Sequence, residues 1–564
     1  MTEAIVTTEK TPADYGLKHI DFRLGQREAI EWTLAQQGTS IISATTGSGK
    51  TSFARALGQE KKTVALVRTR MLQQENYERG YDFMPLYGRA NYDCVHADAE
   101  EGRKADNCIF AEVGMMRCSH GQRAQQIVAP NGEDEDLSDF EPCPYVLARE
   151  KAKNGRRATL NYAYWFNVYE RWPTPEILVC DEAHQLSDLV LEWAGVTISD
   201  EIRIKWGLAP FPMIRGNGGI LTPSTPTTDR AIVWLNQGLV TLRSIMAQLS
   251  SAIEYDEKAR KQSQQCELLG KKLRATLDAL QSAPDDWYIK SGPGVKDGRP
   301  AFIARPLTAR HHFKRYFMNE KSRLVIMSAT IGDPKVFSAE LGINDYSYLD
   351  IPSQFKSQER PILALDVPRM GHSSGDKEFG KQADEIAKAI KDCPKDWAGI
   401  IHTSSAAEAP RLAERLARRG LQDRVWVAPR GSTEQMAEAW HEQAHKKPGS
   451  ININWAMWEG YDPDPSINLK ICIAAKVPYA PLNDEYEIAR RNYDGKMYLQ
   501  RAAYNMEQGL GRSRRGRKQD YDINGERNGL VAIADNSWRW IKGYLSQSIR
   551  ESIVDMKGVK HENC

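Results

Sequence analysis

The chain has 564 residues, of which 41% are hydrophobic and 27% charged, and its formal net charge is +2. This length exceeds what one hydrophobic core holds, so three or four domains of a soluble globular protein are expected. The near-neutral charge excludes a uniform polycation, so any nucleic acid has to be bound by a local group of lysines and arginines. No apolar run reaches the ~18 residues that span a membrane, and no signal peptide is evident. We therefore expect a cytoplasmic or nucleoid-associated protein that makes no membrane contact.

The first predicted α/β unit, at residues 15–90, contains a glycine-rich loop of the kind that binds phosphate. The apolar run 40–43 predicts a strand, which leads through Ala44-Thr-Thr-Gly-Ser-Gly-Lys-Thr51 into a helix near 52–57, and 63–67 predicts the next strand. Backbone N–H groups at such a turn cradle phosphate, Lys50 can reach the β- and γ-phosphates, and the Thr51 hydroxyl can bind Mg²⁺. Upstream, Arg23 and Gln26 could contact adenine. The loop residues predicted to bind nucleotide are Thr46, Gly47, Ser48, Gly49, Lys50, Thr51 and Ser52.

The next part of the chain carries a cluster of cysteines. Four of the nine cysteines fall between residues 94 and 143, and in a reducing compartment clustered thiols indicate metal ligands or redox groups rather than disulfides. Four thiolates suit either a [4Fe–4S] cluster or a structural zinc ion. His96 and His120 are nearby spare ligands that keep zinc open, and unligated buried cysteines are a third interpretation. The four candidate ligands are Cys94, Cys108, Cys118 and Cys143.

An acidic box follows a second buried strand, predicted at 176–180. The box reads Asp181-Glu-Ala-His184, and ligands of open α/β sheets bind at the carboxyl ends of strands. Asp181 would hold Mg²⁺, Glu182 would orient or deprotonate the attacking water, and His184 would complete the nucleotide site. The alternative is a surface acidic pair at the start of a helix.

The middle of the chain predicts a helical hairpin. Residues 200–225 are rich in Pro, Gly and Thr, which indicates a domain boundary. Leucines recur from 235 to 249 and again from 269 to 280 at helical spacing, and we expect these two stripes to pack on each other. A strand at 323–327 leads into Ser328-Ala-Thr330, and after about residue 350 a second α/β unit has strands near 397–402, 451–455 and 469–474.

The second unit adds a basic motif, Gln508-Gly-Leu-Gly-Arg-Ser-Arg-Arg515. Arg512 and Arg515 are three residues apart on a predicted helix, and planar guanidinium groups stabilise charge on a transferring phosphoryl group. A basic solvated helix is the alternative. Gly460 offers a tight turn and Asp462 an acceptor after the strand at 451–455.

Cations and rings near the cysteines are candidates for DNA phosphates and bases. A core of aromatic rings with solvated arginines explains each of them equally well. These residues are Arg117, Arg123, Tyr145, Tyr162 and Trp165.

In this order the motifs resemble those of superfamily 2 helicases, and three stretches resemble the XPD/DinG family of iron–sulfur DNA helicases. The three stretches are Tyr87-Gly-Arg-Ala-Asn-Tyr-Asp-Cys94, Cys143-Pro-Tyr-Val-Leu-Ala-Arg149 and Leu160-Asn-Tyr-Ala-Tyr164. The resemblance runs from about residue 15 to 545 and is thin over 200–310. Two departures are the ten-residue spacing of Cys108 and Cys118 and the Ser-Ala-Thr motif, where the family often has Ser-Gly-Thr.

The resemblance implies an α/β fold of two RecA-like motor domains, with a cysteine-ligated Fe–S domain and a helical Arch domain inserted in the first. The first motor domain would take 1–90, 166–200 and 311–345, the Fe–S domain 91–165, the Arch 201–310 and the second motor domain 346–564. The implied activity is ATP-dependent unwinding of DNA, 5′→3′ on a single strand, with Mg²⁺ and a [4Fe–4S] cluster. Expected partners are single-stranded DNA and duplex junctions. An RNA or RNA–DNA hybrid remodeller and an ATP-switched binding protein are the alternatives.

Overall fold

The computed structural model describes residues 10–44, 48–96, 102–108, 118–128, 138–212, 225–252, 256–296, 298–353, 356–371, 373–458, 464, 466–513 and 529–557. The chain divides into two compact units. Unit 1 comprises residues 1–42, 49–327 and 338–349, and unit 2 comprises 43–48, 328–337 and 350–564. Within the described ranges, no helix has the length and apolar character needed to cross a membrane.

Unit 1 is built on a seven-stranded sheet of order β10-β1-β9-β5-β2-β4-β3. Its strands are β1 (Thr39–Ala44), β2 (Thr63–Val67), β3 (Met84–Leu86), β4 (Arg157–Asn161), β5 (Ile177–Cys180), β9 (Arg323–Ser328) and β10 (Ser347–Ile351). The pairs β2–β4, β2–β5, β3–β4 and β5–β9 are parallel. Every residue of β1, β2 and β5 is buried, as expected where helices cover both faces of a parallel sheet.

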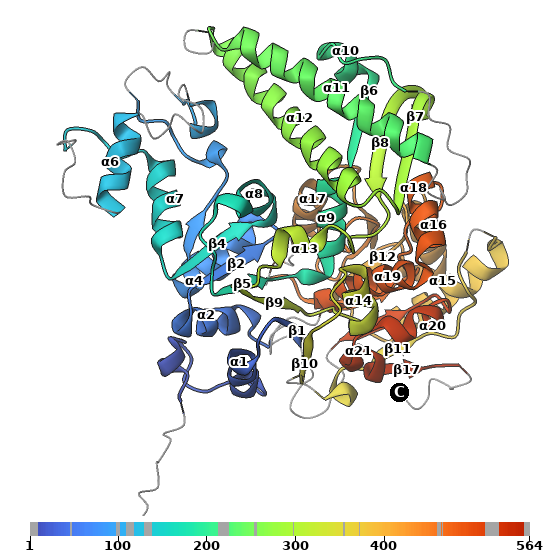
Figure 1. Ribbon diagram of the computed structural model, residues 1–564. Coiled ribbons are helices and arrows are strands. Elements are labelled where there is room, and N and C mark those ends of the chain that lie inside the picture. The colour runs from blue at the N-terminus through green and yellow to red at the C-terminus, as the bar shows by residue number, and fades with distance from the viewer. Residues whose placement is uncertain are drawn as a thin grey trace, which may run out of the picture. The chain divides into compact units, whose positions relative to one another are not determined.

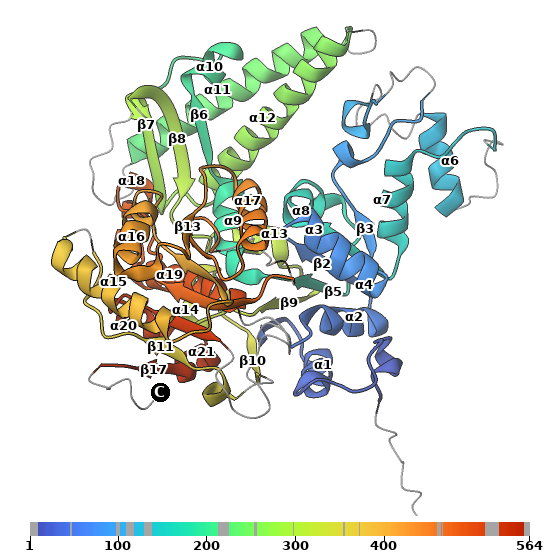
Figure 2. The ribbon, with the colours of Figure 1, turned by 180° about the vertical axis from the view of Figure 1, so that it is seen from behind.

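Two long helices form an antiparallel hairpin within unit 1, α11 (Thr225–Leu249) and α12 (Glu257–Ser282) (Figures 1 and 2). The predicted leucine stripes do pack, since Leu235, Leu239, Leu273 and Leu277 share one core cluster. The same cluster includes Phe302 from a three-stranded antiparallel sheet that the sequence did not predict. Its strands are β6 (Val196–Ser199), β7 (Trp287–Lys296) and β8 (Arg299–Pro306). The prediction missed β7 because its centre reads Ser-Gly-Pro-Gly, a turn-like sequence.

The remaining helices of unit 1 are short. They are α1 (Gln26–Ala35), α2 (Lys50–Glu60), α3 (Arg70–Leu72), α4 (Arg79–Tyr81), α6 (Ser119–Val128), α7 (Pro144–Asn154), α8 (Tyr162–Val168), α9 (Leu186–Ala194), α10 (Asp200–Lys205) and α13 (Phe313–Phe317), while α14 (Pro334–Glu340) is divided between the units. Among them, α2 begins at Lys50, inside the phosphate-loop motif. α9 follows the acidic box after one 3-10 turn, Ala183–Gln185.

Unit 2 holds the second seven-stranded sheet, of order β13-β14-β12-β15-β16-β11-β17. Its strands are β11 (Ile362–Ala364), β12 (Ala398–His402), β13 (Val425–Val427), β14 (Ile451–Asn454), β15 (Leu469–Ala474), β16 (Leu530–Ile533) and β17 (Ile553–Asp555). All six pairings are parallel. The strands predicted at 397–402, 451–455 and 469–474 are therefore confirmed to within one residue.

Helices cover both faces of this sheet. They are α15 (Asp376–Lys391), α16 (Glu408–Leu416), α17 (Thr433–Lys446), α18 (Glu485–Tyr493), α19 (Gly495–Leu510), α20 (Trp538–Ile541) and α21 (Gln547–Ser552). α15 and α16 contribute Ile386 and Leu412 to one core cluster, while α17 contributes Trp440 to another. The chain leaves β12 toward β13 on one side, and leaves β15 toward β16 on the other. The crevice at the carboxyl ends of β12 and β15 is therefore a switch point of the kind where α/β sheets bind ligands.

A buried acid lies in the core of unit 2. Glu507 on α19 is 5% exposed, and its carboxylate accepts a hydrogen bond from the backbone N–H of Ser546. Burial raises the pKa of Glu507 to about 8, and the negative charge of Asp350 adds to this rise. The folded protein therefore holds a proton on Glu507 that the unfolded chain releases near its ordinary pKa.

Stability of unit 2 should fall as pH rises. Below the unfolded pKa both states hold the proton and the stabilisation is fully present, and it is lost as pH rises through about 8. The steepest slope for one proton is about 1.4 kcal/mol per pH unit. Glu507→Gln keeps the acceptor for Ser546 but cannot ionise, so urea unfolding at pH 5.5 and 7.5 should show a smaller loss of stability than in the wild type. Equal losses in both proteins would contradict the protonated state.

Candidate nucleotide-binding site

Of the phosphate-loop motif, Ala44 and the residues from Ser48 onward are described, and Thr46 and Gly47 lie outside the described residues. Gly49 has φ = 88° and caps α2, a left-handed conformation that favours glycine. A Cβ at Gly49 would lie 2.8 Å from Nε2 of Gln26, so the loop packs directly on this amide. The Ser48 hydroxyl is buried and has no hydrogen-bond partner within the described part of the chain. Thr51 and Ser52 follow in the first turn of α2, with Ser52 buried.

Lys50 faces the acidic box. Its Nζ lies 3.7 Å from Oε1 of Glu182, and their side chains are only 12% and 28% exposed. The other carboxylate oxygen of Glu182 lies 3.5 Å from Nδ1 of His184. Glu182 has φ = 51°, and a left-handed backbone at a residue that carries a Cβ is strained. Such strain is common where a side chain has to be aimed into a functional site.

Asp181 is held from several sides. Tyr77 OH donates to Oδ2 at 2.8 Å, the backbone N–H of Glu182 donates to Oδ1 at 2.8 Å, and Tyr162 OH donates to the backbone carbonyl at 2.7 Å. Burial and the charge of Glu182 raise the pKa of Asp181 to about 6, against the opposing effects of Lys50 and Tyr77. Two carboxylates packed this closely favour a cation between or beside them.

The predicted adenine-contacting residues lie beside the loop. Oε1 of Gln26 accepts a hydrogen bond from the backbone N–H of Arg23 at 3.1 Å and pairs with Nε2 of His19 at 3.1 Å. Gln26 is 1% exposed, and its Nε2 has no partner among the residues that the structure describes. The sequence signal for this residue was weak, whereas the structure leaves its amide donors uncommitted at the loop.

The predicted residues of unit 2 are only partly described. Gly460, Asp462 and Arg515 lie outside the described residues. Nε2 of Gln508 donates to Oγ1 of Thr330 at 3.3 Å, so the motif at 508–515 and the Ser-Ala-Thr motif meet within unit 2. Arg512 is 2% exposed and donates to the backbone carbonyl of Trp458 at 2.9 Å.

The backbone brings the cysteine segments together. The N–H of Cys94 donates to the carbonyl of Arg103 at 2.8 Å, and that of Cys143 to the carbonyl of His120 at 2.9 Å. The thiol pKa of Cys143 is raised by burial and further by Cys118 and Cys94, so both of these thiols lie within electrostatic reach of Cys143. Over the described ranges, however, no three His, Cys, Asp or Glu side chains are arranged to hold a metal as they stand. Cysteine thiolates are suitable ligands for a metal, but the described side chains are not arranged closely enough to surround one.

The aromatic candidates for DNA contact belong to the core instead. Tyr145 and Tyr162 are 1% exposed and Trp165 is 5% exposed. Trp165 Nε1 donates to the carbonyl of Tyr316 at 2.9 Å, and Tyr162 supports Asp181. Their prediction as base-stacking residues is wrong, because helices α7 and α8 turn these rings inward. Arg117 lies outside the described residues, and Arg123 is half-buried on α6.

Helix α9 is fastened at both ends. At its start, Ser187 Oγ donates to Oε1 of the buried Glu340 at 2.5 Å, and Glu340 also accepts from Thr308 at 3.1 Å. At its end, Nζ of Lys272 from α12 donates to the carbonyls of Glu192 and Trp193, the latter at 3.1 Å. A cation at the last carbonyls of a helix is stabilising.

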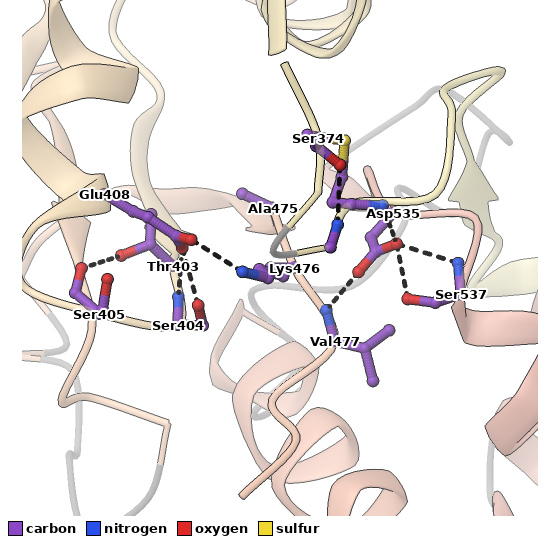
Figure 3. A network of polar contacts seen from close by, with 12 residues as sticks. Ser374, Thr403, Ser404, Ser405, Glu408, Ala475, Lys476, Val477, Asp535 and Ser537 are labelled. Carbon is purple, nitrogen blue, oxygen red and sulfur yellow. Dashed lines mark hydrogen bonds and ion pairs between the residues drawn. The ribbon is translucent and has the colours of Figure 1, made fainter. Parts of the chain in front are cut away.

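A second polar site lies at the carboxyl ends of the unit 2 strands (Figure 3). Asp535, after β16, accepts hydrogen bonds from the N–H groups of Val477, Met370 and Ser537, each at 2.9 Å, and from the Ser537 hydroxyl at 2.6 Å. This buried carboxylate ties together the loops that follow β11, β15 and β16. Its hydrogen-bonding capacity is committed within the unit, so its role is to position the loops.

Near Asp535, a charged pair joins the loop after β15 to the first residue of α16. Lys476 Nζ lies 2.8 Å from Oε1 of Glu408, and Ser404 Oγ donates to Oε2 of Glu408 at 2.7 Å (Figure 3). A pocket of about 330 Å³ opens here, lined in part by Thr403, Lys476 and Arg411. Sequence reasoning missed this site, although polar residues directly after predicted strands at 397–402 and 469–474 were a usable signal.

The sequence comparisons gave two helicase relatives, and no family model matches the chain. The ATP-dependent DNA helicase YoaA of Haemophilus influenzae is 24% identical over 214 residues, covering 30% of this chain and 33% of that protein. YoaA of Escherichia coli is 23% identical over 202 residues, covering 28% of this chain and 32% of that protein. The alignments therefore span about a third of these relatives.

The fold comparison extends over nearly the whole chain. A solved structure titled as an XPD helicase has a TM-score of 0.53 at 16% identity and covers 94% of this chain and 98% of its own. A second, titled as XPD in the apo form, has a TM-score of 0.50 at 13% identity and covers 94% and 99%. At such identities the likeness concerns the fold, and it agrees with the two seven-stranded sheets. Together with the ordered motifs and the YoaA relatives, it supports the resemblance of this chain to the XPD/DinG family of superfamily 2 helicases.

Proposed function

We propose that the protein is an ATP-dependent DNA helicase that moves 5′→3′ along a single strand. The observation that carries this proposal is the group formed by Lys50, Asp181 and Glu182, in which a cation at the start of α2 faces two carboxylates after β5. Two donors beside this group have no partner among the described residues. They are the hydroxyl of Ser48, in the loop, and the amide of Gln26, which packs on the loop. A helix N-terminus with uncommitted donors suits phosphates, and the acidic pair suits Mg²⁺.

Each residue then has a distinct role. Lys50 would bind the β- and γ-phosphates, and Thr51 and Asp181 would hold Mg²⁺, which would neutralise charge on the phosphates. Glu182 would orient the attacking water and accept its proton, with His184 fixing the Glu182 carboxylate. Gln26, supported by Arg23, would donate from Nε2 to the adenine ring. The loop residues Thr46, Gly47, Ser48, Gly49 and Ser52 would contribute backbone and hydroxyl donors.

Unit 2 would complete the motor. Arg512 and Arg515 would stabilise charge on the transferring phosphoryl group, with Gln508, Gly460 and Asp462 shaping the same region. The polar pocket at the carboxyl ends of β12 and β15 would bind the DNA strand. Lys476 and the hydroxyl of Thr403 are suited to backbone phosphates, and the charge of Lys476 can be shared between Glu408 and a phosphate.

The four cysteines would hold a [4Fe–4S] cluster that keeps a small wedge domain folded beside the DNA. Support comes from the family and from the proximity of Cys94, Cys118 and Cys143, with Cys108 on the adjoining segment. The cluster would contribute a rigid cross-link between these segments. The surrounding 91–165 would then serve as the wedge and the hairpin α11–α12, within 201–310, as the Arch.

Lys50→Ala should abolish ATP hydrolysis while leaving the fold intact, because it removes the lysine amine that faces the acidic pair. We expect a loss of at least about 100-fold in kcat measured with single-stranded DNA present. Lys61→Ala is the matched control, since Lys61 lies at the other end of α2 in a surface pair with Glu176. Retained unwinding by Lys50→Ala would overturn the assignment.

Gln26→Ala should weaken the preference for ATP over GTP with little change in kcat. The loss of one donor to the base corresponds to about 1 kcal/mol, or roughly five- to tenfold in the ratio of kcat/KM values. Gln36→Ala, at the far end of α1 and hydrogen-bonded to Trp32 and Ser347, serves as the control. An unchanged ATP/GTP ratio in Gln26→Ala would exclude base recognition by this residue.

Metal analysis tests the cysteine site. Anaerobically purified protein should contain about four irons and absorb visible light. Cys143→Ser should lose most of both, whereas Cys266→Ser, whose thiol is buried in α12 and donates to the Leu242 carbonyl, should keep them. A colourless protein with one zinc would instead support the zinc interpretation.

The alternatives predict different responses to nucleic acid. An RNA or RNA–DNA hybrid remodeller would be stimulated more strongly by RNA or hybrid than by single-stranded DNA in the same hydrolysis assay. A binding protein that uses ATP as a switch would show nucleotide-dependent affinity without displacing a strand. Directional strand displacement on DNA distinguishes the helicase from both.

A further inference from the structure

A second pocket adjoins the pocket at the carboxyl ends of β12 and β15, which we call the strand-edge pocket. It measures about 540 Å³ and is lined by Asp376, Gly380 and Glu414 together with four arginines, Arg411, Arg415, Arg418 and Arg419. We call these four residues the arginine row. Arg411 and Arg415 also line the pocket at the ends of β12 and β15, so the two pockets adjoin along α16.

The geometry of α16 aligns the row. Arg411, Arg415 and Arg418 are spaced by four and three residues, which places them on one face of α16 and the turn Ala417–Leu421 that extends it. Seven residues of helix cover roughly 10 Å. The two pockets together present five cationic side chains, the row and Lys476, against three carboxylates. A continuous surface with a positive surplus is suited to a chain of negative charges.

Two members of the row are held in place. Arg415 lies 3.0 Å from Asp376 and stacks over the Phe379 ring at 4.9 Å. Arg419 Nε lies 2.6 Å from Oδ1 of Asp384, and its guanidinium also donates to the Gly380 carbonyl at 3.0 Å. These contacts fix the floor of the surface.

The other two members are available to a ligand. Arg411 is exposed and has no hydrogen bond or ion pair within the described part of the chain. Arg418 pairs with Glu414, but their side chains are 73% and 62% exposed, and such a surface pair is readily exchanged for another partner. A phosphate, which accepts two parallel hydrogen bonds from a guanidinium, can compete with that pair.

We propose that the arginine row carries the phosphodiester backbone of the nucleic-acid strand beyond the strand-edge pocket, along α16. This inference rests on the proposed function, because it extends the path of the strand assigned to that pocket. Arg411 binds the phosphate next to the carboxyl ends of β12 and β15, and Arg418 binds a phosphate farther along α16. Phosphate contacts of this kind read no base, so the row adds affinity without sequence preference.

The salt dependence of binding to single-stranded DNA tests the proposal. Removing one phosphate-binding side chain should reduce the slope of log K against log salt by about 0.7, so Arg411→Ala and Arg418→Ala should each show this reduction and the double variant about twice as much. Lys446→Ala is the matched control. Lys446 is 75% exposed and pairs with Glu442 four residues earlier on α17, as Arg418 does with Glu414, but it lies outside both pockets.

Oligonucleotide length locates the phosphate-binding positions. Arg418→Ala should weaken binding of long strands and leave the shortest bound strand unaffected, whereas Arg411→Ala should weaken both. Thermal unfolding of each variant should match the wild type because both side chains are exposed.

Three outcomes would count against the proposal, and they are distinguishable. Unchanged slopes in all row variants, with DNA-stimulated hydrolysis intact, would overturn the arginine row and leave the helicase proposal standing. If no oligonucleotide stimulates hydrolysis in the wild type, the proposed function itself fails. Slopes unaltered for DNA but weakened capture of an acidic polypeptide would assign the row to a protein partner and also overturn the proposal.

Discussion

The charged group of Lys50, Asp181 and Glu182 constrains much of unit 1. Two carboxylates and an amine that are mostly withdrawn from water are costly unless each is paired or hydrogen-bonded. Around them the chain commits two buried tyrosine hydroxyls, a backbone N–H and a strained backbone at Glu182. Tyr162, which follows the cysteine segment in the sequence, points inward for the same reason, because its hydroxyl donates to the backbone carbonyl of Asp181. For the divalent cation and phosphates that we propose as ligands, such preorganised charge is favourable, because little has to reorient when they bind.

The sequence predicted the strands of the two parallel sheets better than those of the three-stranded antiparallel sheet. The buried strands at 63–67 and 469–474 were predicted to the residue, because parallel strands covered on both faces are short continuous apolar runs. The strand β7 was missed because it continues through a turn-like Ser-Gly-Pro-Gly sequence, with antiparallel pairing to β8 up to Gly292 and again at Lys296. Local propensity cannot register that tertiary contribution.

The candidate sites show a similar division. A contiguous loop such as 44–51 can be recognised in the sequence, because the residues predicted to contact phosphate follow one another in a single turn. The pocket around Lys476 does not, since Thr403, Glu408 and Lys476 come together only through the strand order of the second sheet. The inward orientation of Tyr145 and Trp165 could not be predicted either. An aromatic residue near arginines in the sequence can be exposed or buried, and the sequence pattern is the same in both cases. In both sheets, however, the polar groups lie at the carboxyl ends of central strands.

The fastening of α9 has a mechanical consequence. This nine-residue helix starts one turn after the acidic box, is tied at its first turn to Glu340, and is capped at its last carbonyls by Lys272 of the long helix α12. A helix of that length is about 13 Å of stiff rod. A rod anchored at both ends transmits displacement instead of absorbing it. We therefore expect a displacement of α12 at Lys272 to move α9, and with it the turn that joins α9 to the acidic box.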